Sequence, residues 1–213
     1  MTLDSLTYEP LEGAATWRLV ALHGWGANAA DLGSLAAYLR LPGFTLVCPE
    51  APWPHPQVPG GRMWYSFPPG YDFCQPHDVG QQADLQASRL ALQQWLEAIA
   101  ADSAIPLERT VLAGFSQGGA ITLDLGWQLP LAGQISLSGY LHGPISPPVS
   151  PRPLTIVHGT FDPVVPIQAA YTARAQLEQQ GQPVRLHELA MGHEILPEVI
   201  ALVLQFCEDL RRS

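Results

Sequence analysis

Short apolar runs alternate along this chain with longer segments in which apolar residues recur at the spacing of an α-helix. The runs predict strands at residues 17–24, 44–50, 109–115, 133–141, 153–159 and 183–190. The longer segments predict helices at residues 27–40, 78–102, 116–128, 166–181 and 197–212. Near-continuous apolar strands are buried on both faces, and their regular alternation with helices is typical of parallel sheets. The sequence therefore predicts an α/β fold with a mostly parallel central sheet and helices on both of its faces.

Length and composition predict one globular domain, residues 1–213. The chain is 47% hydrophobic and 14% charged, which suits a sizeable buried core, and it shows no internal repeat or dividing linker. Its net charge is −9, and all 10 basic residues are arginine. Without lysine there is no P-loop lysine and no Schiff-base nucleophile. The acidic balance argues against nucleic acid as a main partner.

The three cysteines, Cys48, Cys74 and Cys207, are widely spaced and predict no disulfide framework. Reduced thiols of this kind fit a cytoplasmic protein. The N-terminal residues lack a basic region followed by a long apolar run, so no signal peptide is expected. No apolar stretch reaches the roughly 20 residues that a membrane-spanning helix needs. We therefore expect a cytoplasmic protein without a membrane span.

The stretch LAGFSQGGAI (residues 112–121) places Ser116 between two glycines, where a predicted strand meets a predicted helix. In that context the pattern G-x-S-x-G is typical of the nucleophile elbow of α/β-hydrolases. The turn is so sharp that side chains two positions either side of the serine would collide, which favours Gly114 and Gly118. The hydroxyl then lies at a helix N-terminus, which favours a developing oxyanion. Serine in a Gly-rich turn is also common without catalysis, so the flanking elements give the pattern its meaning.

A nucleophilic serine needs a general base, and that base needs a carboxylate to orient it. In α/β-hydrolases the chain order is serine, acid, histidine. His193 follows the last predicted strand and is the predicted base, and Asp162 follows the strand at 153–159 and is the predicted acid. Simpler interpretations are a loop histidine that caps the last helix and an aspartate that forms an Asx turn ahead of Pro163.

Four other polar residues are weaker candidates. His187 lies inside a predicted strand and is interpreted as an ordinary strand residue. His23 precedes the nucleophile in the chain and is interpreted as a structural hydrogen-bonding residue. Asp124 lies on the helix after the elbow, about two turns beyond the serine, where it would point away from the strand ends. Ser138 lacks the preceding glycine of an elbow and is interpreted as a strand end that lines the site.

An oxyanion hole needs at least two hydrogen-bond donors. The backbone N–H of Gln117, directly after the nucleophile, is the first predicted donor. The loop LHGWGAN (residues 22–28) follows an early strand, and Gly24 and Gly26 allow it to turn tightly. The backbone N–H of Trp25 in this loop is the second predicted donor.

The segment at residues 51–76 is rich in proline, glycine and aromatic residues and is long for a loop without secondary structure. Such loops are commonly lids or binding loops. We predict that Met63, Trp64, Tyr65 and Phe67 bind substrate, and that the segment forms an acyl pocket or a lid. The competing interpretation is that these side chains fill the core beneath a loop.

Four stretches in order, LHGWGANAADL, GFSQGGAI, HGTFDPVVP and MGHEI, resemble the phospholipase/carboxylesterase family of α/β-hydrolases. In particular they resemble small bacterial carboxylesterases related to acyl-protein thioesterases, from about Val20 to about Leu210. The segments CPEAPWP and GGRMWYSF are similar to the family's connection between its second strand and its long helix. The sequence departs from the family at Ser66, where an acidic residue is frequent, and at residues 70–76, which have no clear counterpart.

The resemblance implies that Ser116 is the nucleophile, Asp162 the acid and His193 the general base. It also implies an oxyanion hole formed by the N–H groups of Trp25 and Gln117, no cofactor, and a monomer or homodimer. The two departures lie beside the predicted acyl-binding segment, so they bear on the substrate rather than on the mechanism.

These predictions converge on a serine carboxylesterase that cleaves carboxylic esters or thioesters of a small ester or acyl substrate through an acyl-serine intermediate. Acyl-protein thioesterase-like and lysophospholipase-like activities fall within this prediction. The alternatives are a non-catalytic small-ligand-binding protein on the same scaffold, and a peptidase or lactone hydrolase with the same triad. A metal hydrolase is not indicated, because there is no HExxH and no close ligand cluster. The stretch GWGANA lacks the third glycine of the dinucleotide-binding pattern. We therefore expect no metal and no cofactor.

Overall fold

The computed structural model describes residues 3–73, 82–126, 128–143 and 150–213. Within these residues the main sheet has 7 strands in the order β1-β3-β2-β6-β7-β8-β9. The strands are β1 (Ser5–Tyr8), β2 (Trp17–Leu22), β3 (Phe44–Pro49), β6 (Thr110–Phe115), β7 (Gly133–Leu137), β8 (Leu154–Gly159) and β9 (Arg185–Leu189). Only β1 pairs antiparallel to its neighbour, β3, and the other neighbouring pairs described are parallel. The predicted mostly parallel sheet is confirmed.

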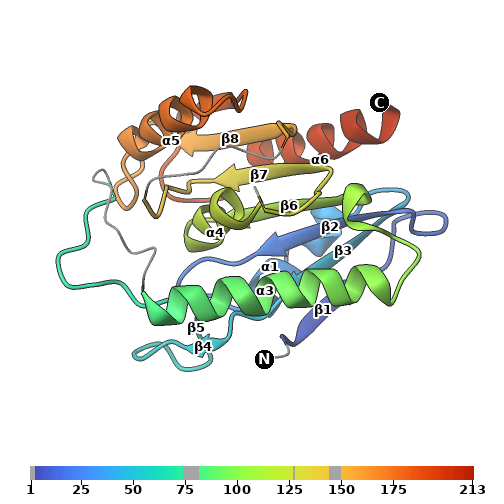
Figure 1. Cartoon of the computed structure of the whole chain (residues 1–213), viewed down its shortest axis with the longest axis horizontal. Helices are drawn as coiled ribbons and strands as arrows, with labels where there is room; N and C mark the ends of the chain where they lie inside the picture. The colour runs from blue at the N-terminus through green and yellow to red at the C-terminus, as the bar shows by residue number, and fades with distance from the viewer. Residues whose placement is uncertain (1–2, 74–81, 127, 144–149) are drawn as a thin grey trace.

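Helices cover both faces of this sheet (Figure 1). One face packs against α1 (Ala29–Gly33), α2 (Ala36–Leu39) and α6 (Pro197–Arg212). The other face packs against α3 (Ala83–Ala101), α4 (Gln117–Leu125) and α5 (Ile167–Gln179). Because side chains alternate along a strand, Leu19 and Val20 of β2 belong to different core layers. The predicted α/β-hydrolase architecture is confirmed.

The segment at 27–40 forms two short helices rather than the single helix predicted from its periodicity. Asn28 caps α1, accepting from the Asp31 N–H at 3.1 Å while the Asp31 carboxylate accepts from the Asn28 N–H at 2.9 Å. The first helix ends at Gly33, where a Cβ atom would lie 2.1 Å from the Tyr8 hydroxyl. The Tyr8 side chain of β1 therefore occupies the space beside Gly33, and glycine is unfavourable inside a helix.

Two elements were not predicted. The edge strand β1 is largely exposed and has no apolar run, and its position is set by backbone pairing with β3, Ser5 opposite Pro49. The hairpin of β4 (Trp53–Pro54) and β5 (Arg62–Met63) lies inside the proline-rich segment at 51–76. The predicted helix at 78–102 begins at Ala83, and residues 74–81 lie outside the described part of the chain.

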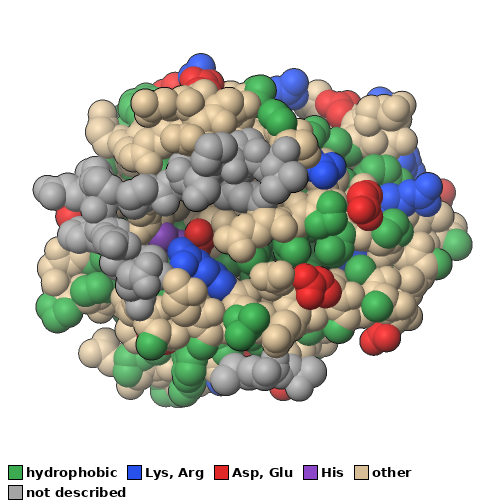
Figure 2. Space-filling view, in the orientation of Figure 1, with side chains coloured by type: hydrophobic (Ala, Val, Ile, Leu, Met, Phe, Trp, Pro, Cys, Tyr) green, Lys and Arg blue, Asp and Glu red, His purple; other side chains and the backbone are tan. Residues whose placement is uncertain are grey.

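The described cysteines, Cys48 and Cys207, are free and buried, and burial raises the pKa of each thiol to about 12. Cys74 lies outside the described residues. Of the helices that the structure describes, none combines the length and apolar character needed to cross a membrane. On the face shown in Figure 2, acidic and basic side chains are scattered among neutral and hydrophobic ones.

Candidate active site

Ser116 lies in a sharp turn between the end of β6 and the first residue of α4. Its backbone adopts φ 54° and ψ −115°, a conformation that side-chain-bearing residues rarely take. Its N–H donates to the Leu137 carbonyl of the neighbouring β7 segment at 2.8 Å. The side chain is partly exposed at the carboxyl edge of the sheet. The serine of the sequence pattern thus has the strained geometry of a nucleophile elbow.

The two flanking glycines are required by close backbone contacts. A Cβ atom on Gly114 would lie 2.2 Å from the Gly118 carbonyl oxygen. A Cβ atom on Gly118 would lie 2.4 Å from the Leu22 carbonyl oxygen at the end of β2. Real Cβ atoms essentially never approach backbone atoms so closely. The elbow therefore admits no side chain at either position.

His193 and Asp162 meet at this serine from two other loops. His193 follows β9, and its Nε2 atom lies 3.0 Å from the Ser116 hydroxyl oxygen. Its Nδ1 atom lies 2.7 Å from the Oδ2 atom of Asp162, which follows β8. The structure therefore brings together all three residues that the sequence singled out, although they are spread over most of the second half of the chain.

The Asp162 carboxylate is fully buried and held on both of its oxygen atoms. Oδ1 accepts hydrogen bonds from the N–H groups of Val164 at 2.9 Å and Val165 at 2.8 Å. Oδ2 faces His193. The aspartate therefore forms a local turn and orients the histidine at once, so the two interpretations weighed from the sequence are compatible.

A second histidine lies next to the Asp162 carboxylate. His158, at the end of β8, is fully buried, and its Nε2 atom lies 2.8 Å from the Val165 carbonyl oxygen. The same atom lies 3.7 Å from Oδ2 of Asp162. Burial lowers the pKa of His158, so the imidazole is neutral and donates its Nε2–H to that carbonyl. No prediction from the sequence included this residue; its place in HGTFD, four positions before the acid, was the available signal.

The weaker candidates lie elsewhere. His187 is inside β9, where burial lowers its pKa. Asp124 on α4 pairs with Arg89 and with His142, away from the His193 imidazole. The Ser138 hydroxyl is fully buried and has no hydrogen-bond partner within the described chain. Ser138 also has a left-handed φ of 49°, which ends β7 earlier than the sequence predicted.

The two backbone N–H groups predicted for an oxyanion hole belong to segments that meet at the elbow. Gln117 is the first residue of α4, and its N–H has no intrahelical acceptor. The loop that holds Trp25 also reaches the elbow, because a Cβ atom on Gly24 would lie 3.4 Å from the Ser116 Cβ atom. Within the described residues, neither the Trp25 nor the Gln117 N–H donates to a backbone carbonyl. Neither predicted donor is therefore engaged by a backbone acceptor in the described residues, and the oxyanion hole itself stays a prediction.

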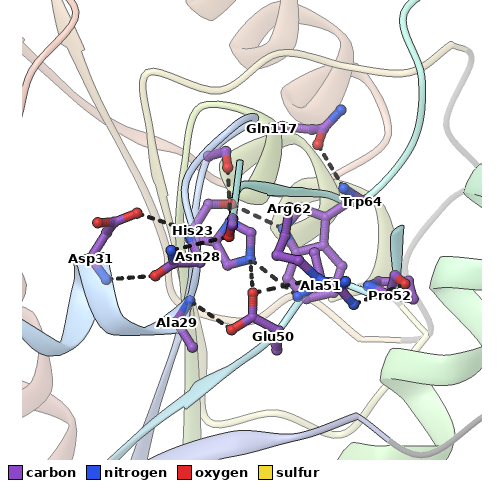
Figure 3. A network of polar contacts seen from close by, with 12 residues as sticks. His23, Asn28, Ala29, Asp31, Glu50, Ala51, Pro52, Arg62, Trp64 and Gln117 are labelled. Atoms are coloured by element: carbon purple, nitrogen blue, oxygen red, sulfur yellow. Dashed lines mark hydrogen bonds and ion pairs between the residues drawn. The ribbon is translucent and has the colours of Figure 1, made fainter. Parts of the chain in front are cut away.

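A polar network holds the Trp25 loop in place (Figure 3). The buried His23 has Nδ1 2.8 Å from the Gly24 carbonyl oxygen, and its Nε2 accepts from the Ala51 N–H at 3.1 Å. Glu50 accepts from the Ala29 N–H at 3.1 Å and pairs with Arg62 at 3.6 Å. The structural role predicted for His23 is confirmed.

A family model described as phospholipase/carboxylesterase matches residues 9–210. The chain belongs to the phospholipase/carboxylesterase family. Acyl-protein thioesterase 1 homolog 1 of Dictyostelium discoideum is 30% identical over 172 residues, which cover 75% of this chain and 74% of that protein. The family predicted from the sequence motifs is confirmed.

Two solved structures resemble nearly the whole chain. Esterase PE8 has a TM-score of 0.87 and 28% identity, with 99% of this chain and 100% of that chain covered. The phospholipase/carboxylesterase from Dyadobacter fermentans DSM 18053 has a TM-score of 0.75 and 26% identity, with 98% of each chain covered.

Among the predicted substrate-binding residues of this family member, Trp64 and Tyr65 are fully buried in the core. The Trp64 indole N–H donates to the His23 carbonyl at 2.9 Å. The Gln117 side chain accepts from the Trp64 N–H at 2.8 Å and donates to the Tyr65 carbonyl at 2.8 Å. The substrate contact predicted for Trp64 and Tyr65 is therefore withdrawn, because both side chains fill the core and fix the loop to the elbow.

The other two predicted residues are only partly buried. Met63 pairs with Trp53 in the small hairpin. Phe67 contacts the Trp25 ring with centroids 5.6 Å apart, Tyr71 at 5.0 Å and Phe73 at 5.6 Å. We call Trp25, Phe67, Tyr71 and Phe73 the aromatic wall. The wall begins at Trp25, which directly follows Gly24 beside Ser116, and segment 51–76 supplies its other three rings.

No group of three or more side chains in the described part of the chain could hold a metal ion. The chemistry that the described site itself offers is a serine hydroxyl hydrogen-bonded to an imidazole, a buried carboxylate behind that imidazole, and two free N–H groups. This set of groups suits acyl transfer to a serine.

Proposed function

We propose that this protein is a serine carboxylesterase that hydrolyses carboxylic esters and acyl thioesters through an acyl-serine intermediate. The observation that carries the proposal is the continuous hydrogen-bonded line from Ser116 through His193 to Asp162. The named relatives, an acyl-protein thioesterase homologue and an esterase, support both leaving-group classes.

In the first half of the proposed reaction, the His193 Nε2 atom takes the proton of the Ser116 hydroxyl as its oxygen attacks the substrate carbonyl carbon. The carbonyl electron pair moves to the oxygen, and the N–H groups of Trp25 and Gln117 stabilise this oxyanion. When the tetrahedral intermediate collapses, the bond to the leaving group breaks. The protonated His193 then gives its proton to the departing alcohol or thiol.

In the second half, His193 takes a proton from water as the water oxygen attacks the acyl-serine carbonyl. A second tetrahedral intermediate forms and collapses, and Ser116 regains its proton as the carboxylic acid leaves. Asp162 accepts the Nδ1–H of His193 throughout, which keeps Nε2 free to accept a proton and stabilises the imidazolium. The two backbone bonds to its Oδ1 atom hold the carboxylate in that orientation.

The proposed acyl site is the aromatic wall. Trp25 is 43% exposed, and Phe67, Tyr71 and Phe73 are half-buried, so their rings can contact an apolar chain that extends from the elbow. Segment 51–76 is thus proposed as an acyl-binding segment within a single domain. A small ester or acyl substrate, a monomeric or homodimeric state and a cytoplasmic location remain predictions.

The decisive experiment combines active-site labelling with turnover. A fluorophosphonate probe should phosphonylate Ser116 with loss of fluoride, and p-nitrophenyl acetate and butyrate should be hydrolysed. Ser116→Ala should abolish labelling and lower kcat by about 10⁴-fold or more. Ser138→Ala is the matched control, since Ser138 is a second positive-φ serine after a strand but is fully buried. It should label and turn over like the native protein.

Other outcomes would contradict the proposal. Native protein that neither labels nor turns over would support a ligand-binding protein on the hydrolase scaffold. A p-nitroanilide cleaved faster than the matching ester would favour a peptidase. Comparing matched esters and thioesters would assign the leaving-group preference.

A further inference from the structure

A second chain of buried polar side chains lies outside the proposed triad. The His142 Nδ1 atom lies 2.9 Å from Oδ2 of Asp124. Its Nε2 atom lies 2.7 Å from the Tyr65 hydroxyl, which lies 2.6 Å from the Tyr140 hydroxyl. Both tyrosines are fully buried, and His142 is 3% exposed. We call Asp124, His142, Tyr65 and Tyr140 the buried polar chain.

The buried polar chain joins an ionised carboxylate to neutral hydroxyl groups. Burial alone would raise the pKa of Asp124, but the hydrogen bonds and charges of His142 and Arg89 outweigh it and lower that pKa. Burial raises the pKa of both tyrosines, so both hydroxyls stay protonated. The carboxylate therefore accepts from His142 Nδ1–H, and the other ring nitrogen of His142 and the two tyrosine hydroxyls continue the hydrogen-bonded series.

The chain ties together three segments that surround the elbow. Asp124 belongs to α4, the helix that begins directly after Ser116. Tyr140 and His142 belong to the segment that follows β7, and Tyr65 follows β5. The Tyr65 carbonyl also accepts from the Gln117 side chain. The position of Tyr65 is therefore fixed at its backbone and at its hydroxyl.

On one side, the tyrosines of the buried polar chain pack against the aromatic wall. The Tyr140 ring lies 4.8 Å from the Phe73 ring and 5.9 Å from the Tyr71 ring. The Tyr65 ring lies 5.6 Å from the Phe67 ring. Three of the four wall residues thus rest on a tyrosine whose rotation is fixed by its hydroxyl.

On the other side, the buried polar chain contacts the loop that holds Asp162. Tyr140 shares a buried cluster with Ala120, Val165 and Ala169. The Val165 N–H is one of the two that hold Asp162. Tyr140 therefore lies between the acid loop and the aromatic wall and sets the distance between them.

We propose that the buried polar chain sets the acyl-length selectivity of this enzyme, with Tyr140 and Tyr65 as positioning residues for the aromatic wall. The proposal rests on the proposed esterase function. Directional hydrogen bonds fix the orientation of these rings, which apolar packing alone would leave less defined. Dispersion contacts weaken steeply with small gaps, so a displaced wall loses contact with a long acyl chain. An acetyl group has only one carbon beyond its carbonyl to contact the wall, so its turnover should respond less to the displacement.

The test removes single hydroxyl groups and measures selectivity. Tyr140→Phe and Tyr65→Phe keep the rings and delete only the links of the chain. For each, kcat/KM on p-nitrophenyl octanoate should fall about tenfold, mainly through KM, while kcat/KM on p-nitrophenyl acetate changes less than threefold. The double variant should lose little more than either single variant, because both hydroxyls serve one chain. Tyr171→Phe, which removes an exposed hydroxyl bonded to Glu188 at 2.6 Å, should match the native protein on both esters.

An unchanged octanoate-to-acetate ratio in both single variants, even with a lower Tm, would overturn the proposal and leave the chain a purely structural role. Failure of the esterase function would look different, as absence of turnover in the native protein on either ester. Binding of the octanoate ester to Ser116→Ala, measured by calorimetry, separates the two cases. Adding Tyr140→Phe should weaken that binding about tenfold, and equal binding would again overturn the proposal.

Discussion

The strained backbone of Ser116 presents its hydroxyl outside the sheet. A strand conformation at this position would continue β6, whereas φ 54° turns the chain directly into α4. The turn is possible because Gly114 and Gly118 carry no side chains where carbonyl groups pass within 2.4 Å of a Cβ position. Such local sterics depend on a few neighbouring residues, so the elbow could be predicted from the sequence.

His23 makes stability depend on pH at the residue scale. Its pKa is lowered by burial from 6.5 to about 4. Between pH 4 and pH 6.5 the His23 imidazole is protonated in the unfolded state but mostly neutral in the folded state. The contribution of His23 to stability is therefore fully present above about pH 6.5 and is lost as pH falls toward 4. The loss at pH 4 is about 3 kcal/mol. Urea unfolding at pH 7 and pH 4.5 should show a smaller pH effect in His23→Asn than in native protein, by about 2 kcal/mol.

The control for this measurement is His187→Asn, since His187 lies in the strand β9 and is only half-buried. It should leave most of the pH dependence in place. Equal pH dependence in native protein and His23→Asn would show that His23 is protonated alike in the folded and unfolded states.

At the scale of elements, Arg18 joins β2 to the end of α3. The residue is 3% exposed, and its guanidinium donates to the Ile99 carbonyl at 2.9 Å, to the Ser103 hydroxyl at 2.7 Å and to the Ile105 carbonyl at 3.2 Å. A helix C-terminus carries unpaired carbonyl groups and a partial negative charge, both of which a guanidinium satisfies. The sequence marks Arg18 only as a charged residue inside an apolar strand.

Arg18→Met should lower the free energy of unfolding by about 3 kcal/mol, because buried carbonyl groups lose their donors. Amide hydrogen exchange should rise in the last turn of α3. Arg174→Met is the matched control, since Arg174 is exposed and its ion pair in the described residues is with Glu178 of the same helix, α5. It should change stability by less than about 0.5 kcal/mol. A loss below about 1 kcal/mol for Arg18→Met would contradict this role.

At the scale of the whole molecule, the proposed active site is assembled from separate loops of the sheet. Its three side chains follow β6, β8 and β9, and backbone hydrogen bonds join the last two loops, from Thr160 to Leu189 at 2.8 Å and from Phe161 to Met191 at 3.1 Å. Forming the site therefore requires the assembled sheet.

Fluorophosphonate labelling should consequently report global unfolding. In a urea titration, the midpoint for loss of labelling should coincide with the midpoint of the far-ultraviolet circular dichroism change, as expected for one cooperative unit. A labelling midpoint at clearly lower urea would show that the site loops unfold before the sheet.

Sequence patterns determined the alternation of strands and helices, the elbow and the order of Ser116, Asp162 and His193, because these follow from local sterics and from where strands end. Only the tertiary structure determined which residues from distant segments contact each other. The exposed strand β1 forms by pairing with β3, Trp64 and Tyr65 fill the core rather than contact substrate, and Asp124 joins His142 and two tyrosines. These outcomes depend on neighbours brought together from distant segments, and burial and pairing across such distances are set by the packed chain as a whole.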